Sequence, residues 1–132
     1  RKLNHAIKMR DFWMPFGPSI LHDRIDDYLI NGKYSPHMII AFDTTNNRKD
    51  ITAAIHPFDL TCRPQTVSTK ENSGYTNVLK SFESKTGIGG ILNTSFNLHG
   101  NPIAWNPDIA IDTFNNSQLD VIALGNYLIK KE

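Results

Sequence analysis

A short apolar run that ends abruptly in polar residues constrains the fold of this chain more than any other feature. The run covers residues 89–93, and Ser95 and Asn97 follow it closely. Its length and position predict a central strand, with an amphipathic helix before it over 73–85 and another helix after it that begins at Pro107. Strands that alternate with helices in this way predict an α/β layer structure.

The remainder of the chain is expected to follow the same alternation. Loosely alternating apolar side chains predict a first strand over 4–16, with Lys8 and Arg10 on one face. Ser19 is then expected to cap a helix that runs to about residue 30. Short apolar runs predict further strands over 38–42, 51–55 and 119–129, the last of them interrupted or turned at Gly125-Asn126.

Composition narrows the class of protein. The 132 residues are expected to form a single domain, 1–132, that is long enough to bury its own core. Lys and Arg number 14 and Asp and Glu number 13, which gives no electrostatic argument for a nucleic acid partner. No apolar run approaches the length of a bilayer span, so we expect no membrane segment.

Cys62 is the only cysteine, which excludes an intrachain disulfide and a cysteine-based zinc cluster. A reducing cytoplasm fits this usage. The histidines are scattered without the spacing of a helical metal site, so no metal site is expected. The chain begins at Arg1 without a signal-peptide core, and we therefore expect it to be part of a longer protein.

Three cations are candidates for an anion site. Lys8 and Arg10 are expected on one strand face, and Arg63 follows an irregular loop that carries His56. Arginine binds phosphate or carboxylate through two hydrogen bonds at once, whereas lysine supplies a compact charge. Solvated surface cations remain the alternative.

The polar residues after the apolar run are the second candidate group. Thr94, Ser95 and Asn97 carry hydroxyl and amide groups that can bind phosphate or nucleotide oxygens at the end of a strand. A polar turn remains the alternative reading of this segment. The aromatic residues are expected in the core rather than on a nucleobase: Trp13, Phe16, Trp105 and Tyr127.

Several spaced motifs, in order, resemble the carboxyl-terminal domain of the nodulation-protein-U and cephalosporin O-carbamoyltransferase family. The resemblance runs almost from end to end. Its landmarks are NHAIKMRDFWMPFGPS (4–19), SPHM (35–38), RPQTV (63–67), TGIGGILNTSFNLHGNPI (86–103), and then NPDIAIDTF and LDVIALGNYLI.

The resemblance implies a YrdC-like fold, an open twisted mixed sheet with helices packed on it. It also implies an active-site signature, KxR followed by SxN, which is Lys8-Met9-Arg10 and Ser95-Phe96-Asn97 here. Such a domain would bind ATP, with Mg²⁺, and carbamoyl phosphate, and would form carbamoyl adenylate with release of pyrophosphate and phosphate. An amino-terminal Kae1-like domain of the same polypeptide, absent from this chain, would pass the carbamoyl group to a hydroxyl acceptor.

The implied roles follow from the chemistry of each side chain. Lys8, Arg10 and Arg63 would hold the two polyanionic substrates, and Lys8 would oppose charge on the adenylate phosphate. Ser95 and Asn97 would position phosphate or carbamoyl oxygens. Thr94 and His56 complete the expected binding set: Lys8, Arg10, His56, Arg63, Thr94, Ser95 and Asn97.

This chain departs from the family pattern at three positions. Met14 stands where an arginine is usual, Leu60 where a glycine is expected, and Asn101 where the family has glutamate. These changes favour one alternative, a degenerate nucleotide-binding or docking module without activity. The other alternative is a threonylcarbamoyl-adenylate synthase, which would use the same fold with bicarbonate and threonine.

Overall fold

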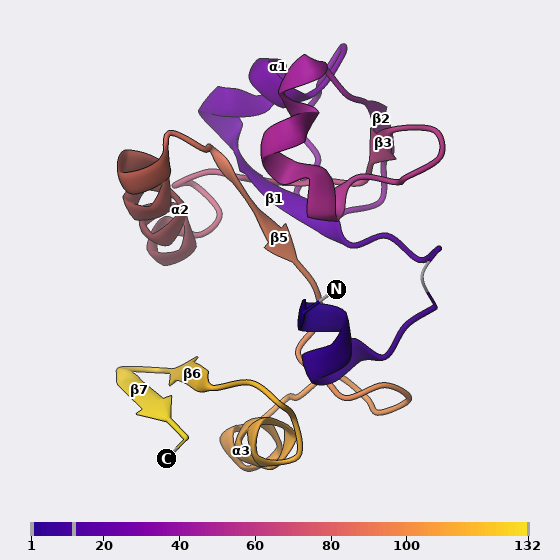
Figure 1. Ribbon diagram of the computed structural model, residues 1–132. Helices are drawn as coiled ribbons and strands as arrows, with labels where there is room; N and C mark the ends of the chain where they lie inside the picture. Colours follow the sequence, from indigo (N-terminus) through magenta and orange to yellow (C-terminus); the bar gives the residue numbers. More distant parts are fainter. Residues whose placement is uncertain (1, 12, 132) are drawn as a thin grey trace. The chain divides into compact units, whose positions relative to one another are not determined.

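The computed structural model describes residues 2–11 and 13–131, and the chain divides into two compact units (Figure 1). Residues 13–94 form what we call the sheet unit. Residues 2–11 together with 95–131 form the hairpin unit. Both contain helices and strands, which confirms the predicted α/β class.

A three-stranded sheet is the framework of the sheet unit. Strand β1, Gly17–Leu21, pairs in parallel with β4, Gln65–Val67, and antiparallel with β5, Gly90–Asn93, so the sheet is mixed as predicted. The strand order is β4-β1-β5, and the strand predicted at 89–93 is therefore correct in extent but lies at an edge rather than in the centre.

The predicted helix that begins at Ser19 is wrong over its first half. Ser19 is fully buried within β1 and does not cap a helix. Helical structure is confined to a 3-10 turn, η2, His22–Arg24, and a single turn of α-helix, α1, Ile25–Tyr28. The segment forms a strand because it is buried, and pairing with strands on both sides provides hydrogen bonds for its backbone N–H and C=O groups.

Two of the predicted short strands also change. The strand predicted over 38–42 is reduced to β2, Phe42–Asp43, which pairs with β3, Thr61–Cys62. The segment predicted as a strand over 51–55 lies mostly in a 3-10 helix, η3, Asn46–Ala54. Thr45 begins this helix, since its side chain accepts a hydrogen bond from the Asn47 N–H.

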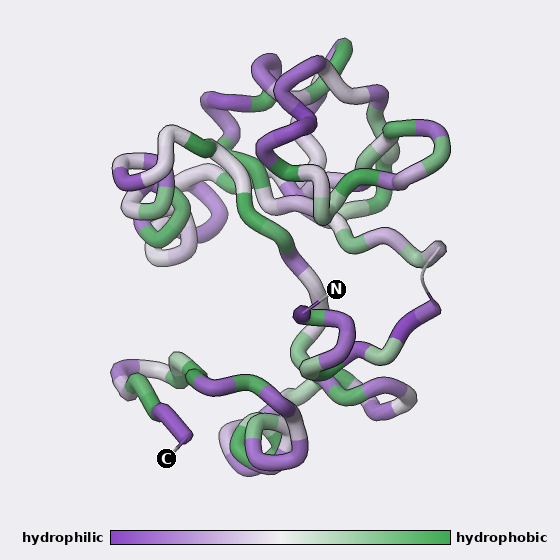
Figure 2. Tube along the Cα trace, viewed as in Figure 1, coloured by the Kyte–Doolittle hydropathy of each residue, from purple (hydrophilic) through white to green (hydrophobic). Residues whose placement is uncertain are grey.

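Apolar side chains pack on both faces of the sheet. On one face Leu21 and Val67 meet Leu79 of α2, Ser73–Thr86, which forms where the amphipathic pattern predicted a helix. On the other face Ile20 joins a larger cluster from α1, η3 and the β2–β3 pair. Figure 2 shows the apolar residues of β1 and β5 between more polar surface segments.

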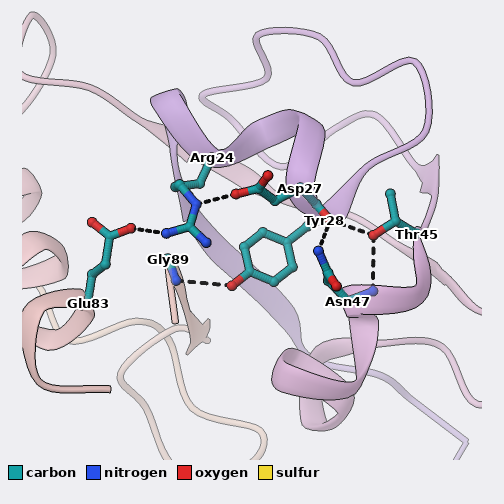
Figure 3. A network of polar contacts seen from close by, with 7 residues as sticks. All are labelled: Arg24, Asp27, Tyr28, Thr45, Asn47, Glu83 and Gly89. Atoms are coloured by element: carbon teal, nitrogen blue, oxygen red, sulfur yellow. Dashed lines mark hydrogen bonds and ion pairs between the residues drawn. The ribbon is translucent and has the colours of Figure 1, made fainter. Parts of the chain in front are cut away.

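A polar network ties α1 and α2 to the start of β5 (Figure 3). The buried Tyr28 hydroxyl accepts a hydrogen bond of 3.0 Å from the Gly89 N–H. Arg24 forms ion pairs with Asp27 and with Glu83 of α2. These contacts fix the point at which the chain enters β5, whose far end carries the polar residues that the sequence singled out.

The hairpin unit begins with a helical turn where a strand over 4–16 was predicted. The turn is a π-helix, η1, Asn4–Lys8, and it ends at Met9, whose φ of 46° is left-handed. The Asn4 side chain accepts from the Arg10 N–H and donates to the Arg10 carbonyl, so local bonds replace those of a sheet. Residue 12, inside the predicted strand, lies outside the described residues.

A helix and a hairpin complete this unit as predicted. Helix α3, Pro107–Asn115, is capped by Asn106, whose side chain accepts from the Ile109 N–H. Strands β6, Val121–Leu124, and β7, Tyr127–Lys130, pair antiparallel around the turn predicted at Gly125-Asn126. Ala110, Phe114 and Ile122 form the core between them.

The expectation that the aromatic residues fill the core is wrong for three of the four. Trp13 is 54% exposed, and Trp105 and Tyr127 are each 76% exposed. Phe16 is half-buried. In the part of the chain that the structure describes, no helix is both long and apolar enough to cross a membrane.

Candidate functional site

The ammonium group of Lys8 lies in a cage of neutral oxygens from the segment after β5. It donates to Ser95 Oγ at 2.9 Å, to Asn97 Oδ1 at 2.5 Å and to the Asn97 carbonyl at 3.4 Å. Ser95 Oγ also donates to Asn97 Oδ1 at 2.6 Å. The structure therefore brings together the two halves of the motif that the sequence predicted, Lys8 with Ser95 and Asn97, from positions 87 and 89 residues apart.

Local backbone geometry orients both Lys8 and the segment that carries Ser95 and Asn97. The end of η1 fixes the direction in which Lys8 leaves the backbone, because the Met9 N–H donates to the Asn4 carbonyl and the Asn4 side chain bonds to Arg10. On the other side, Asn97 Nδ2 donates to the carbonyl of Asn101 at 2.7 Å, which closes a tight loop after Ser95. The Ala104 N–H donates to the Phe96 carbonyl at the base of this loop.

The charge of Lys8 is buried among neutral groups. The residue is only 2% exposed, and among the described residues no carboxylate forms an ion pair with it. Burial lowers the pKa of Lys8, and the positive charge of Arg10 lowers it further. A cation that is held by neutral acceptors next to a second cation is an electrostatic site for an anion.

Arg10, the second cation of the predicted motif, belongs to the same unit. Its backbone is held by both hydrogen bonds to Asn4, and its charge acts on Lys8. Lys8 and Arg10 are therefore electrostatic neighbours, and a turn rather than the predicted strand brings them together.

The other predicted site residues, Arg63, His56 and Thr94, lie in the sheet unit. Arg63 is exposed and immediately precedes Pro64 and β4. His56 Nδ1 lies 3.0 Å from Asp59 Oδ1 in an exposed loop. Thr94 follows β5, and among the described residues its hydroxyl is the buried side-chain group without a hydrogen-bond partner. The structure does not bring these three side chains into one cluster by any contact between them.

A polar network in the sheet unit contains residues that were not among the predicted site residues. Ser19, Gln65 and Asn93 hydrogen-bond to one another across the three strands at 2.9 to 3.1 Å. The Tyr75 hydroxyl of α2 joins them through Ser19 at 2.9 Å. A sequence signal was present, since Gln65 and Asn93 lie inside two of the family landmarks, RPQTV and LNTSFN.

The three departures from the family pattern have distinct structural outcomes. Leu60 adopts a left-handed φ of 61°, a conformation that glycine reaches without strain. Asn101 holds Asn97 through its backbone carbonyl, while the residue itself is exposed. Met14 is 39% exposed.

Metal-ligating residues do not gather in the described part of the chain, where no three His, Cys, Asp or Glu side chains could hold an ion together. The thiol of Cys62 is buried, which raises its pKa to about 12.

Known proteins are similar to this chain over nearly its whole length. The model of a family described as "Carbamoyltransferase C-terminus" matches residues 1–131. An uncharacterized protein of Methanocaldococcus jannaschii is 46% identical over 98% of this chain and 25% of its own length. The nodulation protein NolNO of Sinorhizobium fredii is 32% identical over 98% of this chain and 20% of its own length.

A third relative, nodulation protein U of Rhizobium tropici, is 34% identical over 73% of this chain and 17% of its own length. The chain thus spans about a quarter or less of the length of the curated relatives that it matches.

Proposed function

We propose that this chain, which belongs to the carbamoyltransferase C-terminus family, is the part of an O-carbamoyltransferase that binds ATP and carbamoyl phosphate and forms carbamoyl adenylate. In this proposal its fold is YrdC-like. A separate amino-terminal Kae1-like domain of the longer polypeptide would then transfer the carbamoyl group to a hydroxyl acceptor. The single buried cysteine, Cys62, supports a reducing compartment such as the cytoplasm.

The observation that carries this proposal is the buried ammonium of Lys8, which forms no ion pair with a carboxylate of the described residues. Phosphate oxygens are charged acceptors and form stronger hydrogen bonds with an ammonium group than neutral oxygens do. Ser95 and Asn97 supply hydroxyl and amide groups beside the same ammonium, and Arg10 adds a second positive charge. A phosphate group of ATP is the ligand class that this set matches best.

The reaction balances with the consumption of one water molecule. Water cleaves the bond between the carbamoyl group and phosphate, which releases phosphate and leaves carbamate. An oxygen of carbamate then attacks the α-phosphorus of ATP, and the bond to the bridging oxygen breaks with release of pyrophosphate. Catalysis of this kind depends on orientation and on stabilisation of charge, and we assign the charge stabilisation at the adenylate phosphate to Lys8.

The remaining predicted residues have proposed roles as ligands of the second substrate. Arg63 would bind the phosphate of carbamoyl phosphate, with His56 and Thr94 as further polar partners. Mg²⁺ would enter with ATP, because this ion usually keeps several waters and is bound largely by substrate phosphates.

Calorimetry of ATP binding tests the assignment of Lys8. We expect Lys8→Ala to weaken ATP binding by at least about tenfold, since a charge-assisted hydrogen bond is lost. Lys49→Ala is the matched control, because Lys49 is an exposed lysine of η3, and we expect it to change the affinity by less than about twofold. Equal affinity of wild type and Lys8→Ala would overturn the role of Lys8.

Substrate pairs separate the proposed reaction from its enzymatic rival. We expect pyrophosphate release to require ATP with carbamoyl phosphate and not ATP with threonine and bicarbonate. The reverse preference would identify a threonylcarbamoyl-adenylate synthase instead.

A degenerate binding module is the second candidate function. It is favoured by Leu60, which occupies a left-handed conformation in the loop that leads to Arg63. Nucleotide binding without pyrophosphate release, in the presence of either substrate pair, would support this candidate.

A further inference from the structure

We infer that Asn93 is the residue that selects the carbamoyl group, with its side-chain oxygen accepting a hydrogen bond from the NH₂ of carbamoyl phosphate. This inference rests on the proposed function. It assigns substrate specificity to a residue outside the Lys8 cage and within the sheet unit.

The orientation of the Asn93 amide is fixed by a chain of hydrogen bonds that begins at a backbone carbonyl. The Pro36 carbonyl can only accept, so the Gln65 atom 3.3 Å from it is the donor Nε2. Gln65 Oε1 therefore points the other way, toward Asn93. The Asn93 atom at 2.9 Å from Gln65 Oε1 must be the donor Nδ2.

Ser19 fixes the same orientation from a second side. Its single hydroxyl proton goes to Gln65 Oε1 at 3.1 Å, so Ser19 Oγ accepts from its other neighbours. Tyr75 donates to it at 2.9 Å, and Asn93 Nδ2 also donates to it at 2.9 Å. Asn93 Nδ2 thus donates to oxygens of Ser19 and Gln65, with Met38 Sδ as a further acceptor at 3.7 Å, and Ser19 itself is fully buried.

The side-chain oxygen of Asn93 is left as a hydrogen-bond acceptor for a ligand. Among the residues that the structure describes, no donor reaches Asn93 Oδ1, and this atom is not buried. Because the amide cannot turn over without breaking bonds to Ser19 and Gln65, the position presents an acceptor and no donor. A ligand that meets this atom must bring an N–H or O–H group.

Topology places this acceptor near the backbone of a cationic residue, Arg63. In the sheet register Gly17 of β1 pairs with Asn93 of β5. The point where a Cβ of Gly17 would stand is occupied by Met38 Cε, and the Arg63 carbonyl lies 2.7 Å from the same point, so the backbone of Arg63, just before β4, approaches Gly17.

A small ligand with an anionic group and an NH₂ group suits this pair. Carbamoyl phosphate carries its NH₂ and its phosphate on either side of one carbonyl carbon. Arg63 would bind the phosphate, and Asn93 would accept from the NH₂. Acetyl phosphate has a methyl group in place of the NH₂ and is otherwise of the same shape, so it is the natural probe of this contact.

The first test uses the unmodified chain and compares the affinities for carbamoyl phosphate and acetyl phosphate by calorimetry. We expect carbamoyl phosphate to bind at least about tenfold more tightly, because acetyl phosphate would cover Asn93 Oδ1 without pairing it. Equal affinities would overturn this inference and leave the proposed function standing. Failure of the chain to bind either compound would overturn both.

Variants then locate the discrimination at Asn93. We expect Asn93→Ala to reduce the preference for carbamoyl phosphate to about twofold or less while binding of acetyl phosphate stays within about twofold. Gln65→Met, which releases the Asn93 amide to turn, should reduce the preference in part. Asn77→Ala, at an exposed asparagine of α2, is the matched control and should keep it.

Two outcomes of the variant series would contradict the assignment. An unchanged preference in folded Asn93→Ala would place the discrimination elsewhere. A loss of ATP affinity in Asn93→Ala, with carbamoyl phosphate affinity unchanged, would show that the acceptor serves the amino group of adenine. Circular dichroism of each variant establishes that it is folded.

Discussion

The charge of Lys8 is buried, and we expect its ionisation to make ATP binding depend on pH. Burial, and then the charge of Arg10, lower the pKa of Lys8 from the ordinary value of 10.5. Phosphate binds the ammonium form, so we expect ATP affinity to fall as the pH rises through this lowered pKa. In Lys8→Met the affinity should be weak and should lack this part of the pH dependence.

The stability of the ligand-free protein should change in the opposite direction. In the unfolded chain Lys8 keeps its proton up to a higher pH than in the folded chain, so unfolding takes up a proton between the two pKa values. The free energy of unfolding should therefore rise with pH in this window, below and up to about 10.5. Urea titrations of wild type and Lys8→Met over this range measure the difference, and identical slopes would contradict the burial of the charge.

Part of the site could be predicted at the scale of single residues. The KxR and SxN motifs pointed to Lys8, Ser95 and Asn97, which the structure joins by hydrogen bonds. The role proposed for Asn93 was not predicted, because it rests on the direction of the hydrogen bonds that Asn93 donates to Gln65 and Ser19. Such directions depend on a backbone carbonyl far away in the sequence, and a local pattern does not encode them.

At the scale of elements, the contact of α1 with the start of β5 depends on one hydroxyl. Tyr28 is 1% exposed, and its hydroxyl accepts from the Gly89 N–H. We expect Tyr28→Phe to lower the free energy of unfolding by about 1 to 3 kcal/mol, because it leaves a buried N–H unpaired. Thermal or urea unfolding measures this change.

The exposed Tyr127 provides the control for this substitution. It is 76% exposed on β7, so Tyr127→Phe should change stability by less than about 0.5 kcal/mol. A Tyr28→Phe protein as stable as Tyr127→Phe would contradict the structural role of the hydroxyl.

Elements with a capping signal were predicted better than those without one. Asn106 before Pro107 marks the start of α3, and Gly87 marks the end of α2, as the patterns indicated. The segment 4–16 was misread because the bonds of Asn4 to Arg10, rather than apolar alternation, decide its shape. The prediction that Ser19 caps a helix is wrong because tertiary pairing with β4 and β5 overrides the local preference of serine for a helix N-terminus.

At the scale of the whole molecule, the two units differ in the size of their cores. Among the described residues, the sheet unit buries two apolar clusters, whereas the hairpin unit has one small cluster around Phe114. We therefore expect the hairpin unit to open at a lower denaturant concentration. Amide hydrogen exchange in α3 reports on this unit, and labelling of Cys62 reports on the sheet unit.

Cys62 is suited to this measurement because its thiol is buried and has a pKa raised to about 12. At pH 8 it should resist a thiol reagent until the sheet unit unfolds. Labelling of Cys62 should thus lag behind exchange at Phe114 as urea is increased. Coincident transitions for the two probes would show that the molecule unfolds as one cooperative unit.

The three acceptors around Lys8 have a consequence for which anions can enter its cage. An ammonium group has three protons, and Ser95 Oγ, Asn97 Oδ1 and the Asn97 carbonyl already accept from Lys8. An incoming anion must replace one of them, most easily the carbonyl at 3.4 Å. Halides and other weak acceptors gain little from that exchange. We therefore expect the cage to bind phosphoryl groups in preference to halides.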